Sequence, residues 1–511
     1  MNKPCTIKCG LEEDVAANKS TVPNTPNLKG DWSNFNLLLL LYVLQGFPIG
    51  LSSSLPIILQ SRKMVTYEEQ ALFSIVLWPY TLKVLFAPLV DSLYVQRIGR
   101  RKSWLLPLQY LVGIILMYTA NNIDDWLPKT GKPNLTMIVC VILAINVLSA
   151  IQDIVVDGWS LTMLKKNNVG YASTCNATGL PIGMLIGTVC PILLVSEDFN
   201  NKYFRVMPTT GGLMTLQTFI YLWSIIFLLI TTLIGIFKKE KNDKLELDHV
   251  KISVFQNYKL LWDILKKPKI KLLAIALLTA RFGFSGTDAA SNLKLIDAGI
   301  SKDDIMITVT GMYAVKFIMP IFVSKYISGP KPMDFYLTMT PIRLIWSITY
   351  MVLIYYTPSL INNNGDIKVP IYYYFSLASI FAVNEMLSSF MLLALYAFFC
   401  RSSDPRFGGT YMALYNTFYF LGWLIPNTLV LKMIALLTFS TCSNDIRNSC
   451  LTPDLKSVCA VNGGSCQVFV DGYYMTVIIC MVIGFVWYFL YRNKLRNYKP
   501  MSTSEWSINV S

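Results

Sequence analysis

Two stretches of sequence, LKVLFAPLVDSLY (82–94) and VKFIMPIFVSKY (315–326), repeat one pattern in the two parts of the chain. Each places a lysine inside an apolar run, Lys83 or Lys316, and a proline four or five residues later. Two further pairs follow in the same order: AIN (144–146) with AVN (382–384), and YASTCN (171–176) with YMALYN (411–416). The shared order and spacing predict a chain built from two related halves.

The apolar runs around these repeats are long enough to cross a bilayer. Hydrophobic residues make up 54% of the 511 residues and charged residues only 14%, which is typical of an integral membrane protein. About 20 apolar residues in a helix span the ~30 Å of hydrocarbon. The sequence predicts twelve such helices, at about 35–58, 70–92, 103–121, 136–157, 172–195, 217–237, 270–292, 303–326, 335–356, 370–399, 408–437 and 472–491.

The repeat divides these spans into two sets of six. We therefore expect an all-α integral membrane protein with two six-helix pseudo-repeats and a binding site between them at the bilayer midplane, as in rocker-type secondary transporters. The predicted parts are an N-terminal tail (1–34), a first half (35–237), a linker (238–269), a second half (270–491) that includes a long loop (438–471), and a C-terminal tail (492–511).

Lysine and arginine collect in the loops of one predicted side. The stretch DSLYVQRIGRRKSW (91–104) alone contains Arg97, Arg100, Arg101 and Lys102, and the linker is basic as well. Because short cytosolic loops are enriched in these residues, we predict that this side and both termini face the cytosol. These basic residues then face anionic lipid headgroups. The net charge of +14 therefore does not indicate binding to nucleic acid.

Four cysteines lie in the long loop predicted for the opposite side: Cys442, Cys450, Cys459 and Cys466. In an oxidising compartment they favour two disulfides, with three possible pairings. A zinc site is the alternative, but the loop has no CxxC pair, and the only histidine, His249, lies in the linker. We therefore expect disulfides and no metal or cofactor.

Six stretches of the chain carry a family pattern: YVLQGFPIGL (42–51), SLYVQRIGRRKSWLLPLQY (92–110), QDIVVDGWSLTML (152–164), NVGYASTCN (168–176), GGTYMALYNT (408–417) and DGYYMTVIICMVIGF (471–485). Together they closely resemble the acetyl-coenzyme A transporter family of the major facilitator superfamily. The resemblance covers about residues 30 to 492. It implies a protein of the endoplasmic reticulum membrane that carries acetyl-CoA from the cytosol to the lumen, where acetyltransferases use it.

An anionic cargo of this kind needs positive charge along its path. Within the predicted spans the candidates are Lys83, Arg281, Lys316 and Arg343, and each is costly to insert unless it has a function or a partner. The structural alternatives are that Asp288, seven residues from Arg281, neutralises it; that the two lysines pair with facing acids; and that Arg343 snorkels to the surface.

Uncharged polar side chains could hold the rest of the cargo. They fall on the spans predicted to line a central cavity, although such groups often form hydrogen bonds between helices instead. The candidates are Gln45, Tyr80, Gln109, Asn146, Asn176, Asn384 and Asn416.

Acidic residues near the basic loop suggest a gate. We expect Arg97, Arg100, Arg101 and Lys102 to pair with Asp91, Asp153 and Asp157 when the cytosolic mouth closes, and to be released when it opens. The alternative is that the cations only set the topology. Glu385 is either the equivalent acid in the second half or a proton-coupled carboxylate, and Asp288 is a second coupling candidate.

Other classes fit less well. A membrane acyltransferase would need a catalytic base within the bilayer, which His249 does not provide, and the chain has no Walker motif for ATP. The remaining alternative is a carrier of the same fold for another anionic or thiol-containing solute, such as CoA or a glutathione-like or muropeptide-like cargo. The sequence leaves open whether transport is coupled to CoA or to protons, and whether two chains form a homodimer.

Overall fold

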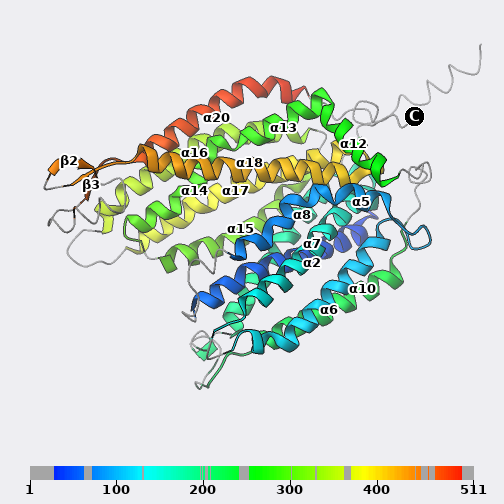
Figure 1. Cartoon of the computed structure of the whole chain (residues 1–511). Coiled ribbons are helices and arrows are strands. Elements are labelled where there is room, and N and C mark those ends of the chain that lie inside the picture. The colour runs from blue at the N-terminus through cyan, green and yellow to red at the C-terminus, as the bar shows by residue number, and fades with distance from the viewer. Residues whose placement is uncertain are drawn as a thin grey trace, which may run out of the picture.

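The computed structural model is almost entirely helical (Figure 1). It describes residues 28–61, 72–128, 132–195, 197, 200–201, 205, 207, 209–240, 253–300, 302–327, 331–361, 370–442, 445–449, 459 and 466–497. The first group of helices comprises α2 (Trp32–Ser61), η1 (Leu72–Leu77), α4 (Trp78–Leu82), η2 (Lys83–Leu85), α5 (Ala87–Ser92), α6 (Lys102–Trp126), α7 (Leu135–Met163), α8 (Tyr171–Val195) and α10 (Leu216–Phe237). The linker contains α12 (Val254–Lys266). The second group comprises α13 (Pro268–Ala280), α14 (Phe282–Asp297), α15 (Lys302–Ile327), α16 (Pro332–Ile361), α17 (Ile371–Ser402), α18 (Gly408–Leu437) and α20 (Gly472–Arg496).

Ten helices in the described residues are long and apolar enough to cross a membrane, counting α13 and α14 together as one span. The predicted second span differs from a continuous helix. It is a series of short turns, η1, α4, η2 and α5, and Pro79 and Pro88 lie in the first turns of α4 and α5, where a helix needs no N–H donor. The predicted number of twelve spans, which would also include α15, stays a prediction.

The two groups lie side by side and spread apart toward the end that carries the strands (Figure 1). Within the first group, α2 and α8 approach closely at Gly46, Gly50, Gly183 and Gly187. A Cβ atom on Gly183 would lie 2.0 Å from the backbone oxygen of Val43. Small residues allow this contact, as is common between helices in membranes.

Replacing Gly183 with valine should therefore destabilise the first group. The side chain would meet backbone rather than a flexible side-chain end, so the helices must separate. We expect a loss of about 2 kcal/mol or more of stability, seen as a lower melting temperature in detergent. Gly311→Val is the matched control, because a Cβ atom there meets nothing within 4 Å; equal melting of the two variants would contradict the tight helix contact.

One end of the bundle, here called the basic end, gathers residues 28–34, 91–102, 165–168, 238–240, 401–407 and 492–497. Asp31 joins two of these segments, 28–34 and 165–168. Burial opposes its ionisation, but the backbone N–H of Lys165 and the amides of Asn168 and Asn34 donate hydrogen bonds of 3.0, 3.0 and 2.8 Å to the carboxylate. These bonds hold the pKa of Asp31 below its usual value.

The opposite end, here called the strand end, carries a small antiparallel sheet. Its strands, β1 (Phe439–Cys442), β2 (Asp445–Ser449) and β3 (Cys466–Val470), have the order β2-β1-β3. Cys442 forms a disulfide with Cys459, which selects one of the three predicted pairings. Cys450 lies outside the described residues, so the second predicted disulfide, which would then join Cys450 to Cys466, stays a prediction.

The linker helix α12 joins the two groups. It begins with a capping box formed by Ser253 and Gln256. Asn257 donates to Ser92 Oγ, and the Tyr258 hydroxyl donates to the carbonyl of Leu85. A segment that leads directly into the second group is thus attached to the broken span of the first.

Candidate functional site

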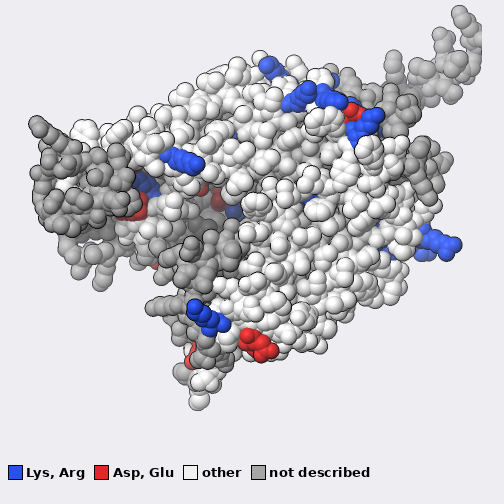
Figure 2. All heavy atoms as spheres, viewed as in Figure 1, with Lys and Arg blue, Asp and Glu red and all other residues white. Residues whose placement is uncertain are grey.

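A cavity of about 390 Å³ lies in the middle of the molecule and extends toward the strand end. Its walls come from α8 of the first group and from α13–α14, α15, α16, α17 and α18 of the second. Figure 2 shows charged atoms within a hollow of a face that is otherwise largely uncharged. The volume is within the range of small-molecule sites.

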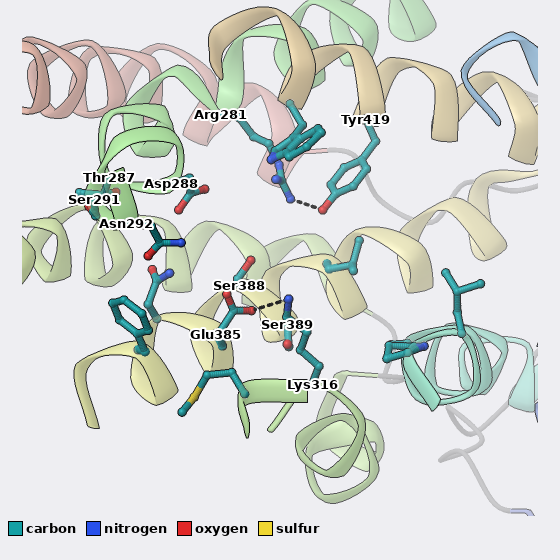
Figure 3. Close-up of a pocket in the computed structure, with 18 of the residues that line it drawn as sticks. Arg281, Thr287, Asp288, Ser291, Asn292, Lys316, Glu385, Ser388, Ser389 and Tyr419 are labelled. Carbon is teal, nitrogen blue, oxygen red and sulfur yellow. Dashed lines mark hydrogen bonds and ion pairs between the residues drawn. The ribbon is translucent and has the colours of Figure 1, made fainter. Parts of the chain in front are cut away.

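Arg281 enters this cavity from a break in its span. Helix α13 ends at Ala280 and α14 begins at Phe282, with Arg281 between them. Its guanidinium group donates to the hydroxyl of Tyr419 and lies 4.4 Å from the centre of that ring (Figure 3). Among the described residues, no carboxylate forms an ion pair with Arg281. Transporter sites are often built at such discontinuous helices.

The other cations near the cavity are paired with acids. Lys316 Nζ lies 3.2 Å from Glu385, an ion pair that Figure 3 shows at the cavity wall. The Arg343 guanidinium contacts both oxygens of Asp288 at 2.9 and 3.0 Å. Asp288 therefore neutralises Arg343 rather than Arg281. Arg343 is buried in the bundle and does not snorkel.

Lys83 lies away from this cavity. Its ammonium group forms an ion pair with Asp153, and the Gln45 amide donates to the same carboxylate. The three side chains are buried. The structure thus places Lys83 in a neutral pair inside the first group and not in the cavity beside Arg281.

Asp157, one turn after Asp153, makes a contact between the groups. It accepts a 2.8 Å hydrogen bond from Tyr42 of α2 and a 2.9 Å hydrogen bond from Asn416 of α18. Neither Asp153 nor Asp157 contacts the basic cluster at 97–102, so this part of the predicted gate is corrected. Both acids lie deeper in the bundle. There they bond to interior side chains, Asp153 to Lys83 and Gln45, and Asp157 to Tyr42 and Asn416.

Asp91 makes the predicted contacts with the cluster. One carboxylate oxygen lies 2.8 Å from Arg101 and 3.2 Å from Arg100, and all three side chains are buried. The other oxygen accepts hydrogen bonds of 2.8 and 2.7 Å from the backbone N–H and hydroxyl of Thr410, at the start of α18. A negative charge is stabilised at this helix terminus. Asp91 therefore links the cluster to the second group.

The remaining cations of the cluster differ from the prediction. Lys102 Nζ donates to the carbonyls of Gly235 and Lys238, at the end of α10, at 2.9 and 2.7 Å. Arg97 is exposed. These two side chains pair with no acid of the predicted gate.

The uncharged candidates divide into two sets. Asn176 and Asn384 line the cavity. Asn146 instead bonds to Ser52 and to the carbonyl of Val76, while Tyr80 and Gln109 lie outside the cavity wall. Sequence reasoning missed several polar or aromatic wall residues: Thr287, Ser291, Asn292, Ser388, Ser389, Tyr419 and Trp423. The polar stripe at 287, 288, 291 and 292 was a signal that could have found part of this wall.

Comparison with solved structures identifies the fold. The chain is similar to FucP, a major facilitator superfamily transporter solved in an outward conformation, with a TM-score of 0.54, 13% identity and coverage of 89% of this chain and 98% of that one. The proton:xylose symporter XylE gives a TM-score of 0.54 at 12% identity, covering 93% and 99% of the two chains. The predicted all-α membrane fold is confirmed as that of a major facilitator transporter.

Sequence comparison identifies the family. The family described as "Acetyl-coenzyme A transporter 1" matches residues 34–251 and 242–508, so the chain belongs to the acetyl-coenzyme A transporter family. An uncharacterized membrane protein of Saccharomyces cerevisiae is 30% identical over 94% of this chain and 98% of its own. An anhydromuropeptide permease of Escherichia coli is 29% identical over 29% of each chain. The chain is a multi-pass membrane transporter and not an enzyme.

Proposed function

We propose that this chain carries acetyl-CoA from the cytosol into the lumen of the endoplasmic reticulum by alternating access. Its family and its fold support transport. The observation that supports an anionic cargo is the position of Arg281. Its guanidinium group faces the central cavity without a carboxylate partner among the described residues.

Acetyl-CoA offers this site a diphosphate and a 3′-phosphate. Arginine binds phosphate oxygens through paired N–H donors, and its hydrogen bond to Tyr419 would hold the side chain in position. Lys316 and Arg343 would add to the site if phosphate competed with Glu385 and Asp288 for them. These two acids are thus the proposed coupling residues, because they would change partners when cargo binds. Asn176 and Asn384 are proposed to contact its uncharged parts.

The contacts between the groups support a state that is closed at the basic end. Asp91 with Thr410, and Asp157 with Asn416, connect the groups on the basic-end side of the cavity. If the basic end faces the cytosol, as its lysines and arginines favour, this is the state open toward the lumen. Opening of the basic end requires both contacts between the groups to break. The ion pairs of Asp91 with Arg100 and Arg101 lie within the first group and would persist.

Uptake into proteoliposomes tests the proposal. Purified full-length chain would be supplied separately with labelled acetyl-CoA, CoA and an anhydromuropeptide. We expect faster uptake of acetyl-CoA than of the other two, and acceleration by unlabelled acetyl-CoA inside the vesicles. Preference for CoA or for the muropeptide would replace acetyl-CoA with that cargo.

A further inference from the structure

A second cavity, of about 800 Å³, lies at the basic end and shares no wall residue with the central cavity. It is formed where α2 and α8 of the first group meet α15 of the second. One wall is apolar, with Trp32, Phe35, Leu39 and Ile321. We call it the lateral cavity, because α2 and α15 both carry strongly exposed side chains beside it.

The charge of the lateral cavity has one sign. Lys29, just before α2, and Lys325, in the last turn of α15, both lie in its wall, and the described part of that wall contains no acidic residue. The two lysines come from different groups of helices. An occupant with negative charge would therefore be attracted to both groups at once.

Two buried hydroxyl groups in the wall also indicate an occupant. Thr174 and Thr178 lie four residues apart on α8 and are 2% and 3% exposed. Their hydroxyls have no hydrogen-bond partner among the residues that the structure describes. Buried hydroxyls are normally paired, and a helical threonine can use the carbonyl four residues earlier, which neither does here. A ligand with acceptor oxygens would satisfy both groups.

We propose that the lateral cavity binds an anionic phospholipid, with the phosphate near Lys29 and Lys325 and the start of an acyl chain against the apolar wall. The depth supports a lipid. The cavity lies at the ends of two spans, where headgroups meet the hydrocarbon, and Trp32 at its edge is 56% exposed, as is typical of interfacial tryptophan.

The neighbouring surface supports the same occupant. Phe322 and Tyr326, on α15 beside Ile321 and Lys325, are 71% and 80% exposed. In a membrane this apolar surface faces lipid, so an acyl chain can pass from the bilayer into the cavity without crossing water. The lipid would bridge the two groups at the basic end and favour its closed state, whatever cargo the transporter carries.

Native mass spectrometry of the delipidated full-length chain tests this site. We expect phosphatidylserine to bind at least fivefold more tightly than phosphatidylcholine, and Lys325→Gln to remove most of that preference. Thr174→Val with Thr178→Val should weaken binding at least threefold, because valine keeps the shape and removes the hydroxyl. Lys271→Gln, an exposed lysine near the same end on α13, is the matched control and should bind like the wild type.

Three outcomes would overturn the proposal. These are equal binding of the two lipids, wild-type phosphatidylserine binding by Lys325→Gln, and displacement of the lipid by millimolar inorganic phosphate, which would assign the site to a soluble anion. A melting curve of each variant checks the fold. The measurement uses no acetyl-CoA, so its result is independent of the proposed cargo.

Discussion

Replacement of Arg281 with glutamine is expected to reduce acetyl-CoA uptake by about 30-fold or more. Removing one partner of a buried charged hydrogen bond costs about 2–5 kcal/mol, and each 1.4 kcal/mol corresponds to a factor of ten. Arg281 is the cavity cation without an acidic partner among the described residues, so its charge is available to cargo without breaking an ion pair. Initial uptake rates in proteoliposomes provide the measurement.

Two further variants separate charge from geometry. Arg281→Lys keeps the charge but loses the planar group that stacks on Tyr419, so we expect intermediate uptake. Lys271→Gln removes an exposed lysine from the same span outside the cavity and should transport normally. Normal uptake by Arg281→Gln, at equal amounts of folded protein, would refute a role for this residue in cargo binding.

The membrane spans were predictable because the thickness of the bilayer fixes their length and apolar character. Most predicted boundaries lie within a few residues of the observed helices, for example 408–437 for α18. The break within residues 72–92 was not predicted, although Pro79 and Pro88 are visible in the sequence. Whether a proline kinks a membrane helix or ends it depends on which neighbours satisfy the freed backbone groups.

The charged residues of the site were predictable, but their partners were not. Arg281 and Asp288 share a face of a continuous helix by spacing. The break at Arg281 places the two residues in different surroundings, and Asp288 meets Arg343 of α16 instead. Pairing depends on how each helix is rotated and tilted against its neighbours, which hydropathy does not encode.

The partners of the predicted gate residues were not predictable from the sequence either. Asp91, Asp153 and Asp157 all lie toward the basic end, so the sequence grouped them with one cluster of cations. Only Asp91 is level with that cluster. Depth along the bundle decides which groups meet, and a single helical turn of 5.4 Å changes the set of neighbours.

Replacement of Asp91 with asparagine is expected to open the basic end and to destabilise the protein. It removes the negative charge shared by Arg100, Arg101 and the start of α18. Leaving buried cations without their partner costs about 3–5 kcal/mol. Hydrogen–deuterium exchange at the Thr410 amide, which donates directly to Asp91, should become about 100-fold faster.

A double variant tests whether the loss of stability comes from the uncompensated positive charge. Asp91→Asn combined with Arg101→Gln also removes one of the two cations that the carboxylate neutralises, so its melting temperature should lie between those of Asp91→Asn and the wild type. Asp263→Asn is the control, because its ion pair with Lys266 is 3.6 Å long and exposed, and such pairs contribute little. If Asp91→Asn kept wild-type melting and slow exchange at Thr410, Asp91 would not hold the two groups together.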